Sequence, residues 1–329
     1  MIFRFSWREL WLIALFCTSF AAADVARACS ICLPGDPIFD AQGAVAQQRG
    51  DLNAYVELRG WTKTSGELPH QEAEGEGGGE ADHGHGEFND SKRLRFLLAW
   101  TPIDRFTMSL NVPVAFNRIE EAETTISTNG LGDIALDVGY VLWRNRDVLP
   151  STFVTGRAFL KTPTGDSRVV IDGTQDPHVQ PGTGSWDFGF GLAATHKLEK
   201  AITYASTTYR INTQGSLDYE YGDVFLLNFV GLLPLGHATG ISWLTRFTAG
   251  LEFNYRWADK DVFHGHDFDD SGGSILYVTP TLAMRIPWFA GRKVPSLRVA
   301  GQIPVTSSWL NGFQEEDPIW FVGLQVPIR

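Results

Sequence analysis

The sequence predicts an all-β membrane protein, a transmembrane up-and-down antiparallel β-barrel of about twelve strands that follows a cleaved signal peptide. Three observations predict this class. The sequence begins with an export signal, no later apolar run is long enough for a spanning helix, and many segments alternate apolar with polar residues. The mean hydropathy of −0.10 does not separate a barrel from a soluble protein, because polar lumen-facing residues offset the apolar lipid-facing ones.

Residues 1–28 have the pattern of a secretory signal peptide. Arg4 and Arg8 precede an apolar run from Leu10 to Phe20, and an A-x-A site follows at residues 26–28. A positive segment, an apolar segment and a small-residue cleavage site indicate an exported protein. We expect residues 29–51 to form a periplasmic N-terminal segment and residues 52–329 to form the barrel. After the signal no run of about 18 apolar residues occurs, so we expect no spanning helix.

Twelve segments alternate apolar and polar residues, as strands with one lipid-facing and one polar face do. In one of them Phe106, Leu110 and Phe116 alternate with Thr107 and Asn111. The predicted strands span residues 52–61, 92–101, 105–117, 132–143, 152–162, 185–197, 201–210, 223–233, 242–257, 275–287, 296–304 and 318–328. Pro113 and Pro280 lie inside two of them, and we expect bulges there because proline cannot donate to a β-ladder.

The connections between these strands alternate between short and long. The long ones, which we expect to be external loops, span residues 62–91, 119–130, 163–184, 212–222, 258–274 and 305–316. Outer-membrane barrels have short periplasmic turns, longer external loops and an even number of strands. A soluble β-sandwich also alternates but has no reason to order its loops in this way. The sequence therefore predicts a protein of the outer membrane of a Gram-negative bacterium, in contact with membrane lipid.

Three short motifs carry a resemblance to a known family. They are GLGD at Gly130–Asp133, KTPTG at Lys161–Gly165 and GTGSWD at Gly182–Asp187. In these motifs the chain resembles the barrel family described as a putative MetA pathway of phenol degradation, over roughly residues 90–329. The resemblance implies an outer-membrane transporter for aromatic or other small hydrophobic compounds. It assigns no functional residue.

Charged residues gather on the polar face of the predicted strands, where they would line the lumen because charge on the lipid face is costly. The predicted pore-lining residues are Arg59, Arg93, Arg95, Arg157, Arg210, Arg246, Glu252, Arg256, Arg285 and Arg298. Lys161, Asp133, Asp137, Asp187 and Glu57 extend the set. One interpretation is a pore that favours anions, since the guanidinium group matches carboxylate and phosphate. The other is a structural ladder of ion pairs that fills the bore.

Two kinds of residue could hold a divalent transition metal. His83 with His85, and His264 with His266, form His-Gly-His pairs beside acidic residues, and in extended backbone such a pair points the same way. The alternative is a solvated acidic loop. Cys29 and Cys32 could form a local disulfide, or a thiolate site for a metal or for redox chemistry.

The sequence shows no G-x-S-x-G, H-E-x-x-H or phosphate-binding loop, so we expect no enzyme activity. A net charge of −11 argues against nucleic-acid partners. Three functional hypotheses follow. The first is a channel for small solutes, either aromatic compounds or anions. The second is a surface barrel that captures zinc, copper or nickel ions, and the third is a structural sheath for an exported redox partner. We also expect that a periplasmic partner could bind the N-terminal segment.

Overall fold

The computed structural model describes residues 49–63, 88–121, 124–146, 150–171, 175, 177–268, 271–286, 294–306, 310–311 and 316–328. The predicted signal peptide, the pair Cys29 and Cys32, and the pair His83 and His85 lie outside these residues. In the described part of the chain, none of the helices is both long and apolar enough to cross a membrane.

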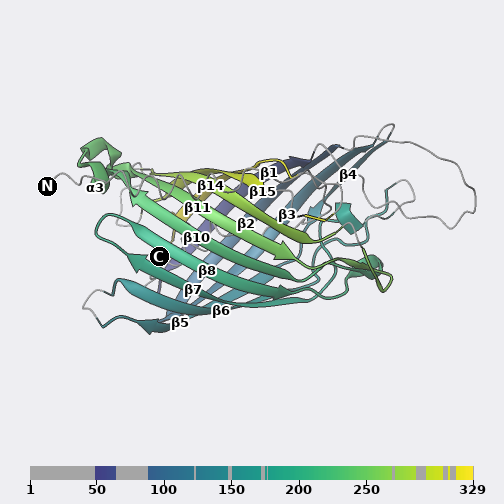
Figure 1. Ribbon diagram of the computed structural model, residues 1–329, viewed down its shortest axis with the longest axis horizontal. Helices are drawn as coiled ribbons and strands as arrows, with labels where there is room; N and C mark the ends of the chain where they lie inside the picture. Colours follow the sequence, from purple (N-terminus) through teal and green to yellow (C-terminus); the bar gives the residue numbers. More distant parts are fainter. Residues whose placement is uncertain are drawn as a thin grey trace, which may run out of the picture.

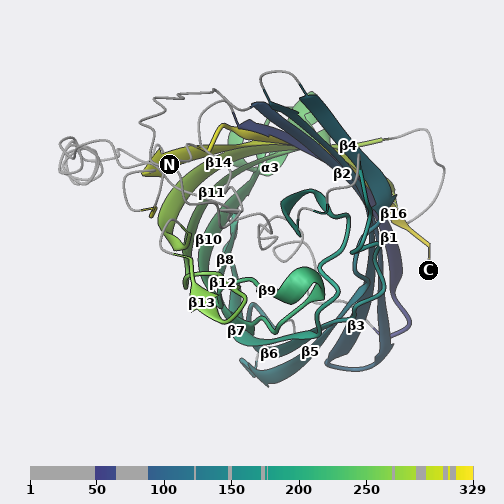
Figure 2. The same cartoon turned by 90° about the vertical axis from the view of Figure 1, so that its right-hand side faces the viewer.

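The chain forms a closed antiparallel β-barrel of twelve strands, which confirms the predicted fold class. The barrel strands are β1 (Leu52–Lys63), β2 (Phe88–Ile103), β3 (Phe106–Glu121), β5 (Ala135–Arg144), β6 (Thr152–Lys161), β7 (Asp187–Lys197), β8 (Ile202–Ile211), β10 (Val224–Pro234), β11 (Phe247–Ala258), β14 (Gly273–Arg285), β15 (Ser296–Thr306) and β16 (Ile319–Pro327). Each pairs with the barrel strands that precede and follow it in the chain, and β16 pairs with β1 to close the ring. Figure 1 shows the oblique strands from the side, and Figure 2 looks along the ring.

The two ends of the barrel differ in the elements they carry (Figure 1). The loop end holds β4 (Thr124–Leu131), β9 (Tyr219–Glu220), β12 (Val262–Phe263) and β13 (His266–Asp267), with the short helices η1 (Pro177–Val179) and η2 (Ser216–Asp218). The turn end holds α3 (Leu235–Thr239) and η3 (Ser242–Arg246), which join β10 to β11. Both chain ends of the barrel also lie there, because Ile328 donates its backbone N–H to Leu52 O at 2.8 Å.

The segment predicted as an external loop at residues 119–130 is instead a hairpin. β3 continues to Glu121, and β4 returns alongside it from Thr124 to Leu131. Its sequence, TTISTNGL, is largely polar and lacks the apolar alternation of a lipid-facing strand. The expectation of a loop was therefore wrong. β4 pairs only with the far end of β3, past the residues that pair with β5, and a strand there need not carry a lipid-facing pattern.

The two prolines inside strands do not mark bulges. β3 pairs with β5 up to Asn111 and with β4 from Val114, so Pro113 lies where β3 changes partner and an N–H can be spared. Pro280 lies in β14 without a register shift, and the irregularity in that strand falls between Leu276 and Tyr277. The predicted bulges at the prolines were therefore wrong. Pro113 nevertheless lies between the β5 and β4 pairings of β3, where no ladder hydrogen bond is lost.

The strand predicted to begin at residue 242 begins at Phe247. Residues 242–246 form η3 instead, closed by Leu244 N–H donating to Ile241 O at 3.1 Å and Thr245 Oγ1 donating to Ser242 O at 2.7 Å. Gly236 of α3 packs on η3, since a Cβ at Gly236 would lie 2.5 Å from Thr245 Cα. The two short helices therefore form one compact connection, and Arg246 lies outside the barrel strands.

The outer face of the wall is apolar and the inner face is polar, as a barrel in lipid requires. Outward-facing Phe190, Phe253 and Leu282 are 59%, 45% and 42% exposed. On the inner face, Asn228 donates to Ser206 Oγ at 3.2 Å and accepts from Asn254 at the same distance. These amide and hydroxyl groups therefore hydrogen-bond to one another along the ring, as buried polar groups generally do.

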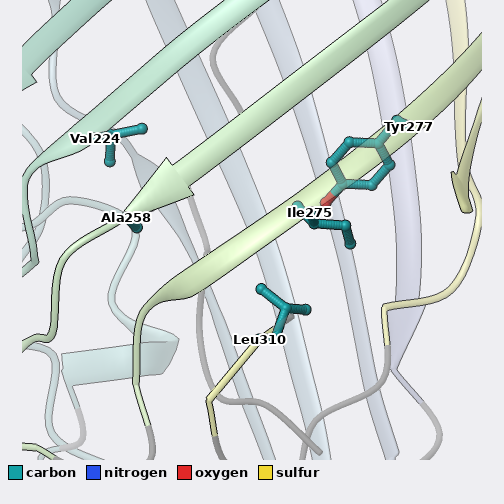
Figure 3. Packing of buried hydrophobic residues seen from close by; sticks show 5 residues of the cluster. All are labelled: Val224, Ala258, Ile275, Tyr277 and Leu310. Carbon is teal, nitrogen blue, oxygen red and sulfur yellow. The ribbon is translucent and has the colours of Figure 1, made fainter. Parts of the chain in front are cut away.

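A small apolar cluster closes one side of the loop end (Figure 3). Val224, Ala258, Ile275 and Tyr277, from the ends of β10, β11 and β14, pack with Leu310. Leu310 bridges to Gly273, and Asn311 N–H donates to Gly272 O at 3.1 Å. The described part of the β15–β16 connection therefore folds back against the wall.

Candidate functional site

On the inner face of the barrel, the charged residues that the sequence predicts to line the lumen are more often basic than acidic. The basic residues are Arg59, Arg93, Arg95, Arg157, Lys161, Arg210, Arg256 and Arg298, and the acidic residues are Glu57, Asp133, Asp137, Asp187 and Glu252. The strand registers place all the predicted pore-lining residues except Arg246 on this face, and Arg285 ends the inner row of β14.

One group of these charges is packed as buried ion pairs. Glu57, 2% exposed, accepts from Arg59 Nη2 at 2.9 Å and Nε at 3.2 Å, and Arg95 Nη1 lies 3.5 Å from the same oxygen. A second pair joins β15 to β11 on the inner face, where Arg298 Nη2 lies 3.7 Å from Oε1 of the fully buried Glu252. In a low-dielectric interior, such charges are stable only when paired. This group fits the structural-ladder interpretation.

The three family motifs meet at the loop end. Lys161 Nζ lies 2.6 Å from Asp187 Oδ2 and 3.3 Å from Asp133 Oδ2, which brings one residue of each motif into a single group, the Lys161 cluster. Asp133 also accepts from Gly165 N–H at 2.9 Å and from Thr183 N–H at 2.7 Å. The motif residues therefore hold β5, β6 and β7 to the chain that connects β6 with β7.

The glycines of these motifs allow backbone segments to touch. A Cβ on Gly165 would lie 2.6 Å from the carbonyl carbon of Gly132 and 2.8 Å from Asp133 N. A Cβ on Gly182 would lie 2.8 Å from Gly165 Cα. Because contacts this short do not occur for real side chains, only glycine fits either position.

The connection between β6 and β7 folds into the mouth of the barrel. We call residues 162–186 the inner loop, of which residues 172–174 and 176 lie outside the described part. Asn117 Nδ2 donates to Val179 O at 2.9 Å, Thr128 Oγ1 donates to the same oxygen, and Tyr221 OH donates to Pro177 O at 3.2 Å. Figure 2 shows coil and a helical turn inside the ring of strands at this end. The inner loop therefore narrows the bore.

A cavity of about 210 Å³ lies against the inner loop. Its wall combines arginines with apolar and amide groups: Arg93, Arg157, Arg210, Leu97, Phe159, Leu226 and Gln180 are among the lining residues. Arg157 Nη2 lies 2.8 Å from Asp137 Oδ2, and the Arg210 guanidinium carbon lies 5.9 Å from the centre of the Phe159 ring. An aromatic face beside guanidinium groups suits a small solute that has both an apolar part and negative charge.

Two predicted pore-lining residues lie elsewhere. Arg246 ends η3 and Arg285 ends β14, both exposed at the turn end, and Arg285 Nη2 donates to Thr245 O. The cavity is not lined by either of them. The alternation that suggested an inward Arg246 does not apply, because its segment is helical rather than extended.

Of the predicted metal ligands, His264 and His266 are described, and the backbone between them is not extended. His264 and Gly265 have φ values of 49° and 80°, typical of a tight hairpin turn, whereas His266 lies in β13. The extended backbone that would point both imidazoles the same way is therefore absent at this pair. Within the described ranges, no group of three or more His, Cys, Asp or Glu side chains could hold a metal ion.

Sequence reasoning missed the residues that reach the cavity from the inner loop. Gln180 and Thr183 line it, and Gln180 is held by Val169 N–H donating to Oε1 at 2.8 Å. The only sequence signal was the GTGSWD motif, which resembled a family without saying what its residues contact.

Comparisons with known proteins agree with this architecture. A family model described as the putative MetA-pathway of phenol degradation matches residues 94–287. An outer membrane channel from Pseudomonas putida F1 is similar over 90% of this chain and 100% of that chain, with a TM-score of 0.62 and 15% identity. A FadL homologue of Pseudomonas aeruginosa is similar over 85% of this chain and 91% of that chain, with a TM-score of 0.41 and 8% identity. No curated protein matches the chain. The predicted family and the predicted outer-membrane barrel fold are confirmed.

Proposed function

The chain belongs to the family described as the putative MetA-pathway of phenol degradation, and from this premise we propose an outer-membrane channel that favours small organic anions. The observation that carries the proposal is the cavity against the inner loop, whose wall joins several arginines to apolar side chains. In this proposal a solute passes the cavity, because the inner loop occupies the mouth beside it.

Aromatic rings flank two of the arginines that line the cavity. Arg93 lies 5.6 Å from the centre of the Trp61 ring and Arg210 lies 5.9 Å from that of Phe159, so each stands against an aromatic face. A guanidinium group held in this way keeps N–H donors in a fixed plane, which suits a carboxylate. Leu97 and Leu226 add apolar surface to the same cavity. These features support a solute that carries a ring or short hydrocarbon beside an acidic group.

The family description supports the aromatic part of the proposal, since phenol degradation handles aromatic compounds and their acidic products would suit such a cavity. The excess of basic over acidic groups on the inner face supports the anionic part. A charge excess in a narrow lumen raises the local concentration of the opposite ion.

Planar bilayers test the proposal. We expect the purified protein to conduct and to prefer chloride to potassium in a salt gradient, and to be blocked by added benzoate more strongly than by added benzyl alcohol. Replacing Arg93 and Arg210 together with Gln should lower the chloride-to-potassium permeability ratio by about fivefold, the factor that roughly 1 kcal/mol of Coulomb energy gives.

Two control variants separate the cavity from general surface charge. Arg144→Gln with Arg146→Gln removes two exposed arginines at the turn end, and Arg246→Gln with Arg285→Gln removes two exposed arginines that do not line the cavity. Both should leave the permeability ratio unchanged. A cation-selective wild-type channel, or an equal loss of selectivity in all three variants, would reject the proposal.

A further inference from the structure

A second cavity lies on the outside of the barrel at the turn end. It has a volume of about 460 Å³ and lies between η3 and the adjoining ends of β11 and β14. Its floor contains Phe247 and Met284, which are direct cross-strand partners. Both continue the outward-facing rows of Leu251 and Leu282, which are 45% and 42% exposed. The floor of this cleft therefore belongs to the lipid-facing surface.

An exposed tryptophan forms one side of the cleft. Trp243 of η3 is 66% exposed, the largest exposure among the large apolar side chains of the described residues. Its ring meets Phe247 edge-on, with centroids 6.1 Å apart and planes at 81°. Tryptophan prefers the boundary between hydrocarbon and headgroups, where its ring is apolar and its N–H is hydrated. The cleft therefore sits at the height of a lipid headgroup.

Two arginines also line the cleft. Arg246 and Arg285 both line the cleft and both are exposed. Arg285 ends the inner row of β14, but its Nη2 donates to Thr245 O, which holds its guanidinium group beside η3. A guanidinium pair above an apolar floor complements an acyl chain that ends in a phosphate.

From this arrangement we propose that the cleft binds an anionic phospholipid of the leaflet at the turn end. The acyl chain lies on Phe247 and Met284, the glycerol region meets Trp243, and the phosphate accepts hydrogen bonds from Arg246 and Arg285. The site explains why two arginines and a tryptophan are exposed together on a connection that the channel itself does not use.

Native mass spectrometry of the purified full chain in detergent tests the site, with phosphatidylglycerol as the probe. The variant Arg246→Ser with Arg285→Ser should weaken the first binding event by about 25-fold, since one basic group near an anionic surface contributes roughly a fivefold factor. The matched control Arg144→Ser with Arg146→Ser removes the same charge from exposed residues at the same end and should change binding less than threefold. Trp243→Ala should also weaken phosphatidylglycerol binding without removing charge.

Two further measurements distinguish the phosphate of a lipid headgroup from free inorganic phosphate. Inorganic phosphate at the same concentration should not displace the lipid, and phosphatidylcholine should bind equally to wild type and the Arg246/Arg285 variant. Displacement by inorganic phosphate would make this a free-anion site and overturn the proposal. An equal loss in the control variant would overturn it as well, since the effect would then be general surface charge. Heat-modifiable electrophoretic mobility checks that each variant is a folded barrel.

Discussion

The two ends of this barrel are built by different kinds of contact. At the loop end, Asp133 binds the backbone of Thr183, 50 residues further along the chain, and Lys161 joins both to Asp187. At the turn end, hydrogen bonds are local, as between Gly240 N–H and Gly236 O. The loop end therefore depends on distant residues that fit together, whereas the turn end tolerates exposed aromatic and basic groups. The comparison indicates that changes at the loop end should cost far more.

The orientation of the two ends predicts an all-or-none difference. Gly265, in the β12–β13 turn, and Gly240, after α3, both have positive φ and open space around the Cβ position. A short epitope inserted after Gly265 should be labelled by antibody on intact cells, because long loops face outward in such barrels. An epitope after Gly240 should be labelled only after the outer membrane is permeabilised. Reversed labelling would invert the assignment of the ends.

The next largest effect is expected in the Lys161 cluster. Lys161→Met leaves Asp133 and Asp187 buried without their cation, which should lower the free energy of unfolding by about 3–5 kcal/mol. Lys197→Met at the turn end removes a lysine that lies 5.3 Å from the Phe153 ring and should cost about 1 kcal/mol or less. Urea unfolding in detergent, followed by tryptophan fluorescence, measures both.

A second change should partly repair the first. Adding Asp187→Asn to Lys161→Met removes one of the two stranded charges and should restore part of the lost stability. If the lysine variants at the two ends cost the same, the loop end is not held by this cluster.

Glycine substitutions should give an intermediate effect. Gly165→Ala places a methyl group against the backbone of Gly132 and should cost about 1–3 kcal/mol by overpacking. Gly301→Ala in β15 has no atom within 4 Å of the new methyl group and should stay within about 0.5 kcal/mol of the wild type. The same unfolding assay compares them. A neutral Gly165→Ala would show that the inner loop moves freely away from β5.

The smallest effect on stability is expected at the histidine pair. His264 and His266 are exposed, so their replacement by Ala should change the free energy of unfolding by about 0.5 kcal/mol or less. The metal hypothesis predicts that zinc binding, measured by calorimetry, disappears when His83 and His85 are replaced as well. Because the backbone at His264 and Gly265 is a turn rather than extended, the double variant alone should alter zinc binding little. Equal binding by wild type and the quadruple variant would leave the channel without a metal role.

The strand pattern was predictable because lipid and lumen impose opposite polarity on alternate residues. That rule places Arg59, Arg157 and Arg298 on the inner face from sequence alone. It cannot say which acid each arginine meets. Glu57 and Arg298 both lie opposite Gly323 of β16, a neighbourhood that brings together strands from the two ends of the chain. Partner choice follows from register, and register follows from closure of the ring.

The rule fails where lipid no longer imposes polarity. β4 is a strand without lipid-facing alternation, and Arg246 lies in a helix despite an apparent alternating pattern around Trp243 and Phe247. The family motifs were visible in the sequence, but their contact through Gly165 and Gly182 depends on a connection that turns inward. The length of the β6–β7 connection alone did not reveal that it turns into the barrel. An ion-pair ladder and a pore that favours anions were competing interpretations of one residue pattern. In the structure the two features overlap, because Arg59 and Arg95 of the ion-pair group also line the cavity.

Closure of the ring between β1 and β16 also governs the order of assembly. The ladder that joins Asn53–Gly60 to Trp320–Pro327 connects the first described strand to the last, so no shorter piece of the barrel can be sealed. Until β16 is in place, β1 and β15 each present an edge of unpaired N–H and C=O groups, which in hydrocarbon cost several kcal/mol apiece. Insertion strand by strand would therefore expose these edges to lipid. We therefore expect both edges to be covered during insertion until β16 pairs with β1.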